Sequence, residues 1–282
     1  MTALPSLPTA WLAAAPGSPP ARKHAQNKGS FGDEAVIGGD RGMTGAALLA
    51  ARAAHAAGAG RVYVNLLDDG APSFDPQRPE LMFRPLWWQG AVDTLSAATV
   101  VCGCGGGDAV RSVLPRLLGT AGRLVLDADA LNAVAADTSL KQLLSARRAR
   151  GRDTVLTPHP LEASRLLETT TRAVQADRLA AAQALAEGFG CVVVLKGSGS
   201  IITAPGAVPV INPTGNAALA TAGTGDVLAG WLGGHWSATG TGALEATRHV
   251  TWLHGRAADL CPTAPLRAAD LVEAMHAAGP RA

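Results

Sequence analysis

Four short apolar segments of this chain each run directly into a polar or glycine-rich turn. These segments are Thr99–Cys102, Arg123–Leu126, Asp153–Leu156 and Cys191–Leu195. Strand-like and helix-like segments alternate along the chain, which is typical of helices that cover a largely parallel sheet. The carboxyl ends of parallel strands meet at one edge of the sheet, where open α/β folds bind their ligands. We therefore predict an α/β fold with its functional site at that edge.

The rest of the chain extends the same pattern from about residue 33 onward. Further strands are expected at Glu34–Ile37 and Arg61–Leu67, and an antiparallel hairpin at Ser200–Thr203 with Val208–Ile211. Residues 68–85 are polar and proline-rich, which indicates a surface excursion. Helices are expected at Met43–Ala57, Leu161–Leu167, Arg172–Glu187, Asp226–Trp236, Gly242–Leu260 and Ala268–Ala278.

The chain has 282 residues, enough to bury a substantial core as one large α/β domain. We expect residues 1–27 to form an extended or flexible N-terminal arm and residues 28–282 to form this domain. The apolar runs are too short to span a bilayer, and a formal net charge of +2 gives no reason to expect nucleic acid or a membrane as partner. The four cysteines show no zinc-ligand spacing, which fits a reducing cytoplasm.

The most informative turn opens the helix expected at Asp226–Trp236. Gly223 and Gly225 allow a tight backbone turn, and the exposed N–H groups of a helix start favour an anion such as phosphate. Asp226 is placed to act as a base on a substrate hydroxyl. Because Asp is also a preferred N-cap residue, a purely structural role as a helix cap stays open.

Lys196 begins a second informative turn, Lys196–Ser200, directly after an apolar run. An ammonium group at a strand end beside small residues suits contact with nucleotide phosphates, although the spacing of a P-loop is missing. An ordinary lysine in a β-turn is the structural alternative.

Three other turns at the same edge carry candidate ligand-binding residues. The run Gly103–Gly107 lacks the dinucleotide-binding fingerprint, but it lets a ligand approach the backbone closely. Asp127 and Asp129 are candidates for holding a hydrated Mg²⁺, and Asp129 could equally cap the following helix. His159, between two prolines, is a candidate partner for a polar ligand or a structural hydrogen-bonding residue.

As an ordered series, these motifs resemble the ADP/ATP-dependent NAD(P)H-hydrate dehydratases of the ribokinase-like superfamily, from about Lys28 to Ala278. The matching segments are Lys28-Gly29, Gly38-Gly39, Thr44–Ala46, Leu126–Asn132, Thr157–Glu162, Leu195–Gly197 and Asn212–Asp226. The resemblance implies a ribokinase-like three-layer sandwich, with a mainly parallel central sheet flanked by helices. It also implies a metabolite-repair lyase that uses ADP or ATP to remove water from the S epimer of hydrated NADH or NADPH.

The resemblance implies a role for each motif. In this family the nucleotide phosphorylates the hydroxyl introduced by hydration, and phosphate then leaves as the ring double bond re-forms. Asp226 is the expected catalytic base, and Gly223, Thr224 and Gly225 the expected anion hole. The adenine nucleotide is expected at Lys196, Gly197, Ser198, Gly199, Ser200 and Gly225, and the hydrated dinucleotide at Ala46, Gly105, His159 and Asp226. Mg²⁺ is expected to bridge the phosphates, and no protein ligand is assigned to it.

Four positions depart from the usual family pattern. The turn after Thr99–Cys102 usually reads Gly-Pro-Gly-Leu-Gly, and here Cys104 and Gly106 replace the proline and the leucine. Met43 stands where an aromatic residue is common, and Leu161 stands where glycine is usual. We expect these changes to affect the flexibility of the loop and the substrate pocket.

Two other functions are compatible with the same residues. A small-molecule kinase of this fold, acting on a vitamin precursor or sugar, would share the Gly-Thr-Gly-Asp turn, whereas a non-catalytic nucleotide-binding protein would need no base. The resemblance also implies a homo-oligomer. Many relatives carry an N-terminal epimerase domain, for which the residues before Lys28 are too few, so an epimerase is expected as a separate polypeptide.

Overall fold

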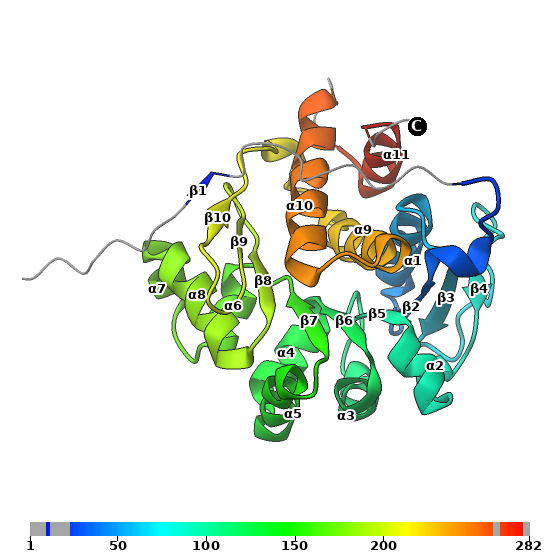
Figure 1. The fold of residues 1–282 in the computed structure, drawn as a ribbon, viewed down its shortest axis with the longest axis horizontal. Helices are drawn as coiled ribbons and strands as arrows, with labels where there is room; N and C mark the ends of the chain where they lie inside the picture. Colours follow the sequence, from blue (N-terminus) through cyan, green and yellow to red (C-terminus); the bar gives the residue numbers. More distant parts are fainter. Residues whose placement is uncertain (1–9, 12–22, 262–265, 279–282) are drawn as a thin grey trace, which may run out of the picture.

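The computed structural model describes residues 10–11, 23–261 and 266–278, and within these ranges ten strands form one sheet (Figure 1). The strand order is β1-β10-β9-β8-β7-β6-β5-β2-β3-β4. The strands are β1 (Ala10–Trp11), β2 (Asp33–Gly38), β3 (Arg61–Leu66), β4 (Met82–Phe83), β5 (Thr99–Cys102), β6 (Arg123–Leu126), β7 (Asp153–Leu156), β8 (Val192–Leu195), β9 (Ile201–Thr203) and β10 (Val210–Ile211).

The sheet is parallel from β8 to β4, and antiparallel pairing occurs where β9 meets β8 and β10. The predicted mainly parallel sheet and the hairpin of β9 and β10 are therefore confirmed. The central strands are continuous apolar runs because both of their faces are covered; every residue of Val192–Leu195, for example, is buried.

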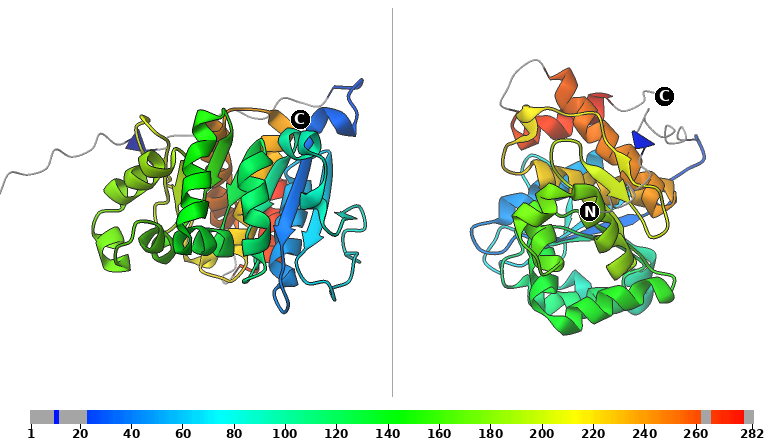
Figure 2. Two further views of the ribbon diagram at one scale, coloured as in Figure 1. Left: turned by 90° about the horizontal axis from the view of Figure 1, so that it is seen from below. Right: turned by 90° about the vertical axis from the view of Figure 1, so that its left-hand side faces the viewer.

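Helices cover both faces of the sheet, as predicted (Figure 2). One layer consists of α1 (Thr44–Ala56), drawn in blue in Figure 1, and of α9 (Thr224–Thr239), α10 (Ala243–Leu260) and α11 (Ala268–Ala278), drawn from yellow-orange to red. The opposite layer consists of α2 (Val92–Ala97), α3 (Val110–Thr120), α4 (Ala128–Ala136), α5 (Thr138–Ala149), α6 (Pro160–Leu166), α7 (Thr171–Ala176) and α8 (Arg178–Phe189). A separate apolar core lies between the sheet and each layer. None of the helices in the described ranges is both long and apolar enough to cross a membrane.

The prediction of one helix at Arg172–Glu187 is wrong. Asp177 ends α7 and begins α8, with φ −145° and ψ 82°, outside the helical region. Its carboxylate accepts a hydrogen bond from the backbone N–H of Ala180 at 2.9 Å. An aspartate that caps a new helix in this way competes with continuation of the old one.

Two segments in which no strand was predicted each contain a short one. Residues 68–85 are mostly loop, but they include β4, which pairs with β3. Asp75 in this loop is buried, and its Oδ2 lies 2.6 Å from the Arg52 Nε. In the predicted arm, β1 pairs with β10, and residues 1–9 and 12–22 lie outside the described ranges.

Candidate active site

The turns that follow β5, β6, β7 and β8 meet at one edge of the sheet, as predicted from the sequence. The backbone N–H of Asp127 donates to the carbonyl of Cys102 at 3.1 Å, and that of Thr157 donates to the carbonyl of Leu126 at 3.1 Å. The backbone N–H of Lys196 in turn donates to the carbonyl of Pro158 at 2.8 Å. Each turn is therefore hydrogen-bonded to the strand end or turn beside it, so the four turns lie side by side.

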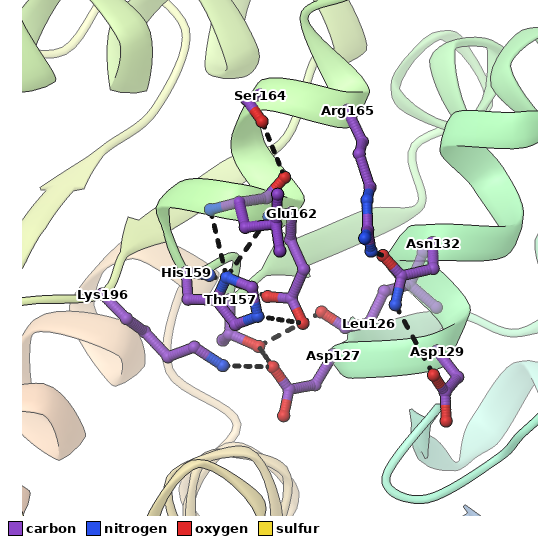
Figure 3. A network of polar contacts seen from close by, with 11 residues as sticks. Leu126, Asp127, Asp129, Asn132, Thr157, His159, Glu162, Ser164, Arg165 and Lys196 are labelled. Atoms are coloured by element: carbon purple, nitrogen blue, oxygen red, sulfur yellow. Dashed lines mark hydrogen bonds and ion pairs between the residues drawn. The ribbon is translucent and has the colours of Figure 1, made fainter. Parts of the chain in front are cut away.

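Lys196 and Asp127 form an ion pair at the centre of this edge (Figure 3). The Lys196 Nζ lies 2.6 Å from Asp127 Oδ1, and the Thr157 hydroxyl donates to the same oxygen at 2.8 Å. Burial lowers the pKa of Lys196, but the negative charges of Asp127 and Glu162 outweigh it, so the pKa is raised overall. Lys196 is therefore a permanent cation, and its partner is a carboxylate whose side chain is 2% exposed.

Asp226 lies in the first turn of α9, beside this pair. A carboxylate oxygen of Asp226, a carboxylate oxygen of Asp127 and the Sγ of Cys104 all lie within 4.8 Å of one another. Burial, and then the charge of Asp127, raise the pKa of Asp226 to about 6, while a hydrogen bond with Cys104 and the charge of Lys196 act in the opposite direction. The helix-cap alternative for Asp226 is wrong, because the N-cap residue is Gly223.

The start of α9 has a fixed geometry. Gly223 takes the left-handed φ of 89°, which favours glycine. The Thr224 hydroxyl donates to the carbonyl of Leu219 at 2.9 Å, so this side chain is turned toward the backbone and any contribution to an anion hole would come from its main chain. His254 Nε2 lies 2.9 Å from the carbonyl of Thr224. Burial lowers the pKa of His254 to about 4, so the neutral ring donates this bond from α10.

A cavity of about 420 Å³ opens next to this helix start. It is lined by all of the predicted nucleotide-binding residues, namely Lys196, Gly197, Ser198, Gly199, Ser200 and Gly225, and also by residues of the Asn212–Asn216 turn and by His254. The volume is in the range of small-molecule sites, which are typically about 300–1,000 Å³. First-turn N–H groups of a helix, such as α9, and the Lys196 ammonium suit the phosphates of a nucleotide.

Arg178 determines the shape of the turn that lines this cavity. From the start of α8, its guanidinium donates to the backbone carbonyls of Leu195, Lys196 and Ser198. Sequence reasoning missed Arg178, because nothing near it in the sequence indicates a contact with this turn. His254 was missed for the same reason.

The predicted substrate residues Ala46 and Gly105 are neighbours. A Cβ atom on Gly105 would lie 2.9 Å from the Ala46 Cβ, so the glycine-rich loop packs directly on the start of α1. Asp129 accepts a hydrogen bond from the backbone N–H of Gly107 at 2.9 Å, which fixes the far end of the loop. Ala128, directly before Asp129 in the sequence, has a φ of 47°. This left-handed conformation is costly for alanine and is often found at functional sites.

His159 is the N-cap of α6. Its Nδ1 accepts hydrogen bonds from the backbone N–H groups of Leu161 and Glu162 at 3.1 and 3.3 Å, and its Nε2 lies 3.2 Å from Glu162 Oε1. Burial, and then Lys196, lower the pKa of His159, whereas burial raises the pKa of Glu162 to about 7. His159 thus has the structural role left open above, but its side chain is 46% exposed and can still reach a ligand.

The carboxylates and the thiol beside Lys196 do not form a site that suits Mg²⁺, an ion that prefers oxygen ligands. Among the described residues, Cys104, Asp127 and Asp226 form a set with suitable spacing. A thiol is a poor ligand for Mg²⁺, and the Lys196 ammonium already occupies Asp127 Oδ1. Asp129, the second predicted candidate, accepts from Gly107. The donor set therefore fits an ion carried mainly by phosphates and water, and we assign no protein ligand.

Comparisons with known proteins agree with this geometry. A family model described as NAD(P)H-hydrate dehydratase matches residues 35–278. The chain is 42% identical over 244 residues to the ADP-dependent (S)-NAD(P)H-hydrate dehydratase of Neisseria meningitidis serogroup B, covering 85% of this chain and 80% of that protein. Other curated relatives are bifunctional NAD(P)H-hydrate repair enzymes, and the chain spans about half of their length (48% and 47% in two of them).

Solved structures show the same fold. The crystal structure of the ADP/ATP-dependent NAD(P)H-hydrate dehydratase of Bacillus subtilis, co-crystallised with ATP and Mg²⁺, superposes with a TM-score of 0.80 at 28% identity and covers 98% of each chain. A ribokinase-like superfamily protein of Enterococcus faecalis superposes with a TM-score of 0.73 at 23% identity, covering 92% of this chain and 90% of that one. The predicted ribokinase-like fold is confirmed.

Proposed function

Because this chain belongs to the NAD(P)H-hydrate dehydratase family, we propose that Asp226 is its catalytic base and that the cavity beside Gly225 binds the adenine nucleotide. The protein is an ADP- or ATP-dependent dehydratase that converts the S epimer of hydrated NADH or NADPH back to the reduced cofactor.

One observation carries the assignment of the base. The Asp226 carboxylate lies at the start of α9, next to a residue that lines the cavity, and its pKa of about 6 leaves it mainly ionised at neutral pH. A base with a pKa near the working pH is both available and strong enough to take a proton. In the first step, Asp226 accepts the proton of the ring hydroxyl, and the hydroxyl oxygen bonds to the terminal phosphorus of the nucleotide. The phosphoanhydride bond to that phosphorus breaks, which releases AMP from ADP or ADP from ATP.

The start of α9 and Lys196 favour this step electrostatically. The backbone N–H groups around Gly223, Thr224 and Gly225 would stabilise the charge on the transferred phosphoryl group, and Lys196 would contact the nucleotide phosphates. Mg²⁺, when bound, would be held mainly by the nucleotide phosphates, and it would neutralise part of their negative charge.

The second step removes the phosphate. Phosphorylation converts hydroxide, a poor leaving group, into phosphate, a good one. The carbon–oxygen bond breaks and inorganic phosphate leaves, and a proton on the neighbouring ring carbon passes to water or to the departing phosphate as the double bond forms. Ala46, Gly105 and His159 are the residues that we propose hold the hydrated dinucleotide during this step.

The test is a turnover assay with purified protein, hydrated NADH, Mg²⁺ and either ADP or ATP. Restored dihydronicotinamide would be followed by its absorbance at about 340 nm, together with release of inorganic phosphate. We expect recovery that needs the nucleotide and falls roughly 10²- to 10⁴-fold in Asp226→Asn. Asp93→Asn, at an exposed position of α2, is the control. A stable phosphorylated product without absorbance recovery would instead identify a small-molecule kinase.

The predicted homo-oligomer, separate epimerase and cytoplasmic location stay predictions.

A further inference from the structure

The thiol of Cys104 is a buried group next to the proposed base. Cys104 is fully buried, and its Sγ lies within 4.8 Å of a carboxylate oxygen of Asp226. No motif in the sequence indicates a role for it, and the reaction as described above makes no use of a thiol.

The backbone of Cys104 is held in a fixed position. Gly103 and Gly105, on either side, take φ angles of 118° and 59°, which strongly disfavour other residues. The carbonyl of Cys104 accepts a hydrogen bond from the Gly39 backbone N–H at 2.9 Å. Gly38 packs so closely that an added Cβ would lie 2.3 Å from the Cys104 carbonyl oxygen. The loop therefore has little freedom to move the thiol away from Asp226.

The thiol stays protonated at any working pH. Burial, and then the negative charges of Asp226 and Asp127, raise the pKa of Cys104 well above the usual range of a thiol. A protonated thiol next to an ionised carboxylate is a hydrogen-bond donor to it. The remaining carboxylate oxygen of Asp226 then stays available to a substrate hydroxyl.

We infer that Cys104 is a positioning residue for this reaction, whose S–H donates a hydrogen bond to Asp226 and holds that carboxylate as the acceptor for the substrate proton. This inference rests on the proposed role of Asp226. The other charged groups that face Asp226 are Asp127 and Asp129 at the start of α4 and Lys196 after β8. The Cys104 thiol and the charge of Lys196 both act to lower the pKa of Asp226.

The experiment compares the pH dependence of kcat/KM in the wild type, Cys104→Ala, Cys104→Val and Cys104→Ser. Loss of the donor in Cys104→Ala and Cys104→Val is expected to move the acidic limb upward by roughly half to one pH unit. Cys104→Ser keeps a donor, so its acidic limb should stay at or below that of the wild type. Cys104→Val fills the space of the thiol, and it serves if the alanine variant folds poorly.

Cys102→Ala is the matched control. Cys102 is equally buried, two positions away, but it packs into the core on the opposite face of the sheet. Its replacement should leave the acidic limb where it is, even if the protein becomes less stable.

The outcomes separate the two proposals. If the wild type restores no cofactor, or Asp226→Asn keeps full activity, the proposed function or its base is wrong. If Asp226→Asn is inactive but the profiles of Cys104→Ala and Cys104→Val superpose on that of the wild type, only the inference about Cys104 is wrong. A shift in Cys104→Ser as large as that in Cys104→Ala would also overturn it.

Discussion

The ammonium nitrogen of Lys196 lies 2.6 Å from Oδ1 of Asp127, and this ion pair joins the residues that directly follow β8 and β6. Both strands end at the same edge of the sheet. Lys196 lines the nucleotide cavity and Asp127 lies next to Asp226, so the ion pair connects the cavity to the proposed base. Its position makes it both a structural contact and a source of charge for the active site.

Breaking this pair is expected to destabilise the protein. Lys196→Met leaves a buried, unpaired carboxylate, which should lower the free energy of unfolding by about 3 kcal/mol. The double variant Lys196→Met/Asp127→Asn removes that charge and should recover at least half of the loss. Urea denaturation of the wild type, both single variants and the double variant measures the coupling. Purely additive effects would contradict the prediction.

The rate should fall with acid through the titration of Asp226. Because burial, followed by the charge of Asp127, raises the pKa of Asp226 to about 6, the ionised base predominates above that pH and is lost below it. We expect kcat/KM to level off near neutral pH and to fall about tenfold per pH unit well below the midpoint. Initial rates between about pH 4.5 and 8 test this, and a flat profile would argue against Asp226 as the base.

Substitution by alanine should have different effects at the two glycines at the start of α9. In Gly225→Ala, the new Cβ would lie 3.4 Å from Lys196 Nζ, an ordinary contact without backbone strain, but the methyl group would stand at the cavity wall. We expect a normal melting temperature and a Kd for ADP raised roughly tenfold or more, about 1.4 kcal/mol.

In Gly223→Ala, the added Cβ would lie 2.7 Å from Leu49 Cδ1, on a backbone with φ 89°. This variant should lose about 1–3 kcal/mol of stability. Thermal denaturation and calorimetric titration with ADP distinguish the two effects. Equal melting temperatures for the two variants would contradict the prediction.

Substitutions of His159 should distinguish its role as a helix cap from its proposed contact with the hydrated dinucleotide. Asn is a good N-cap residue, so His159→Asn should keep the stability of the wild type, whereas His159→Ala should lose about 1 kcal/mol. If the imidazole also contacts the hydrated dinucleotide, both variants should raise KM for it. Denaturation curves and Michaelis kinetics give the two readings, and an unchanged KM in both would leave His159 with the cap alone.

Arg178 should affect nucleotide binding without touching the nucleotide. Arg178→Ala removes the donors to the carbonyls of Leu195, Lys196 and Ser198, so the cavity turn should become less ordered. We expect a Kd for ADP about tenfold higher and little change in KM for the hydrated dinucleotide. Arg172→Ala, at an exposed position of α7, is the control. Equal affinities in the two variants would show that the turn does not depend on Arg178.

The sequence patterns that predicted this fold and site are local. Apolar runs ending in polar turns located β5 to β8, and the Gly-Thr-Gly-Asp and Lys-Gly motifs each carry their chemistry within a few residues. The helix break at Asp177 was missed because helix-forming residues such as alanine continue on both sides of it, and capping by one side chain decided the outcome.

The contacts that could not be predicted join distant parts of the chain. Cys104 meets Asp226 because α9 packs against the sheet edge, and His254 meets Thr224 because α10 packs on α9 within the same layer. Neither contact leaves a spacing in the sequence that could be recognised.

Since Asp226 comes from α9 while Cys104, Asp127 and Lys196 come from strand ends that precede it, no fragment ending before α9 contains a complete site. During synthesis, therefore, the chain must extend into α9 before any turnover can begin. Recovery of activity after dilution from denaturant accordingly reports docking of α9, rather than formation of the sheet alone.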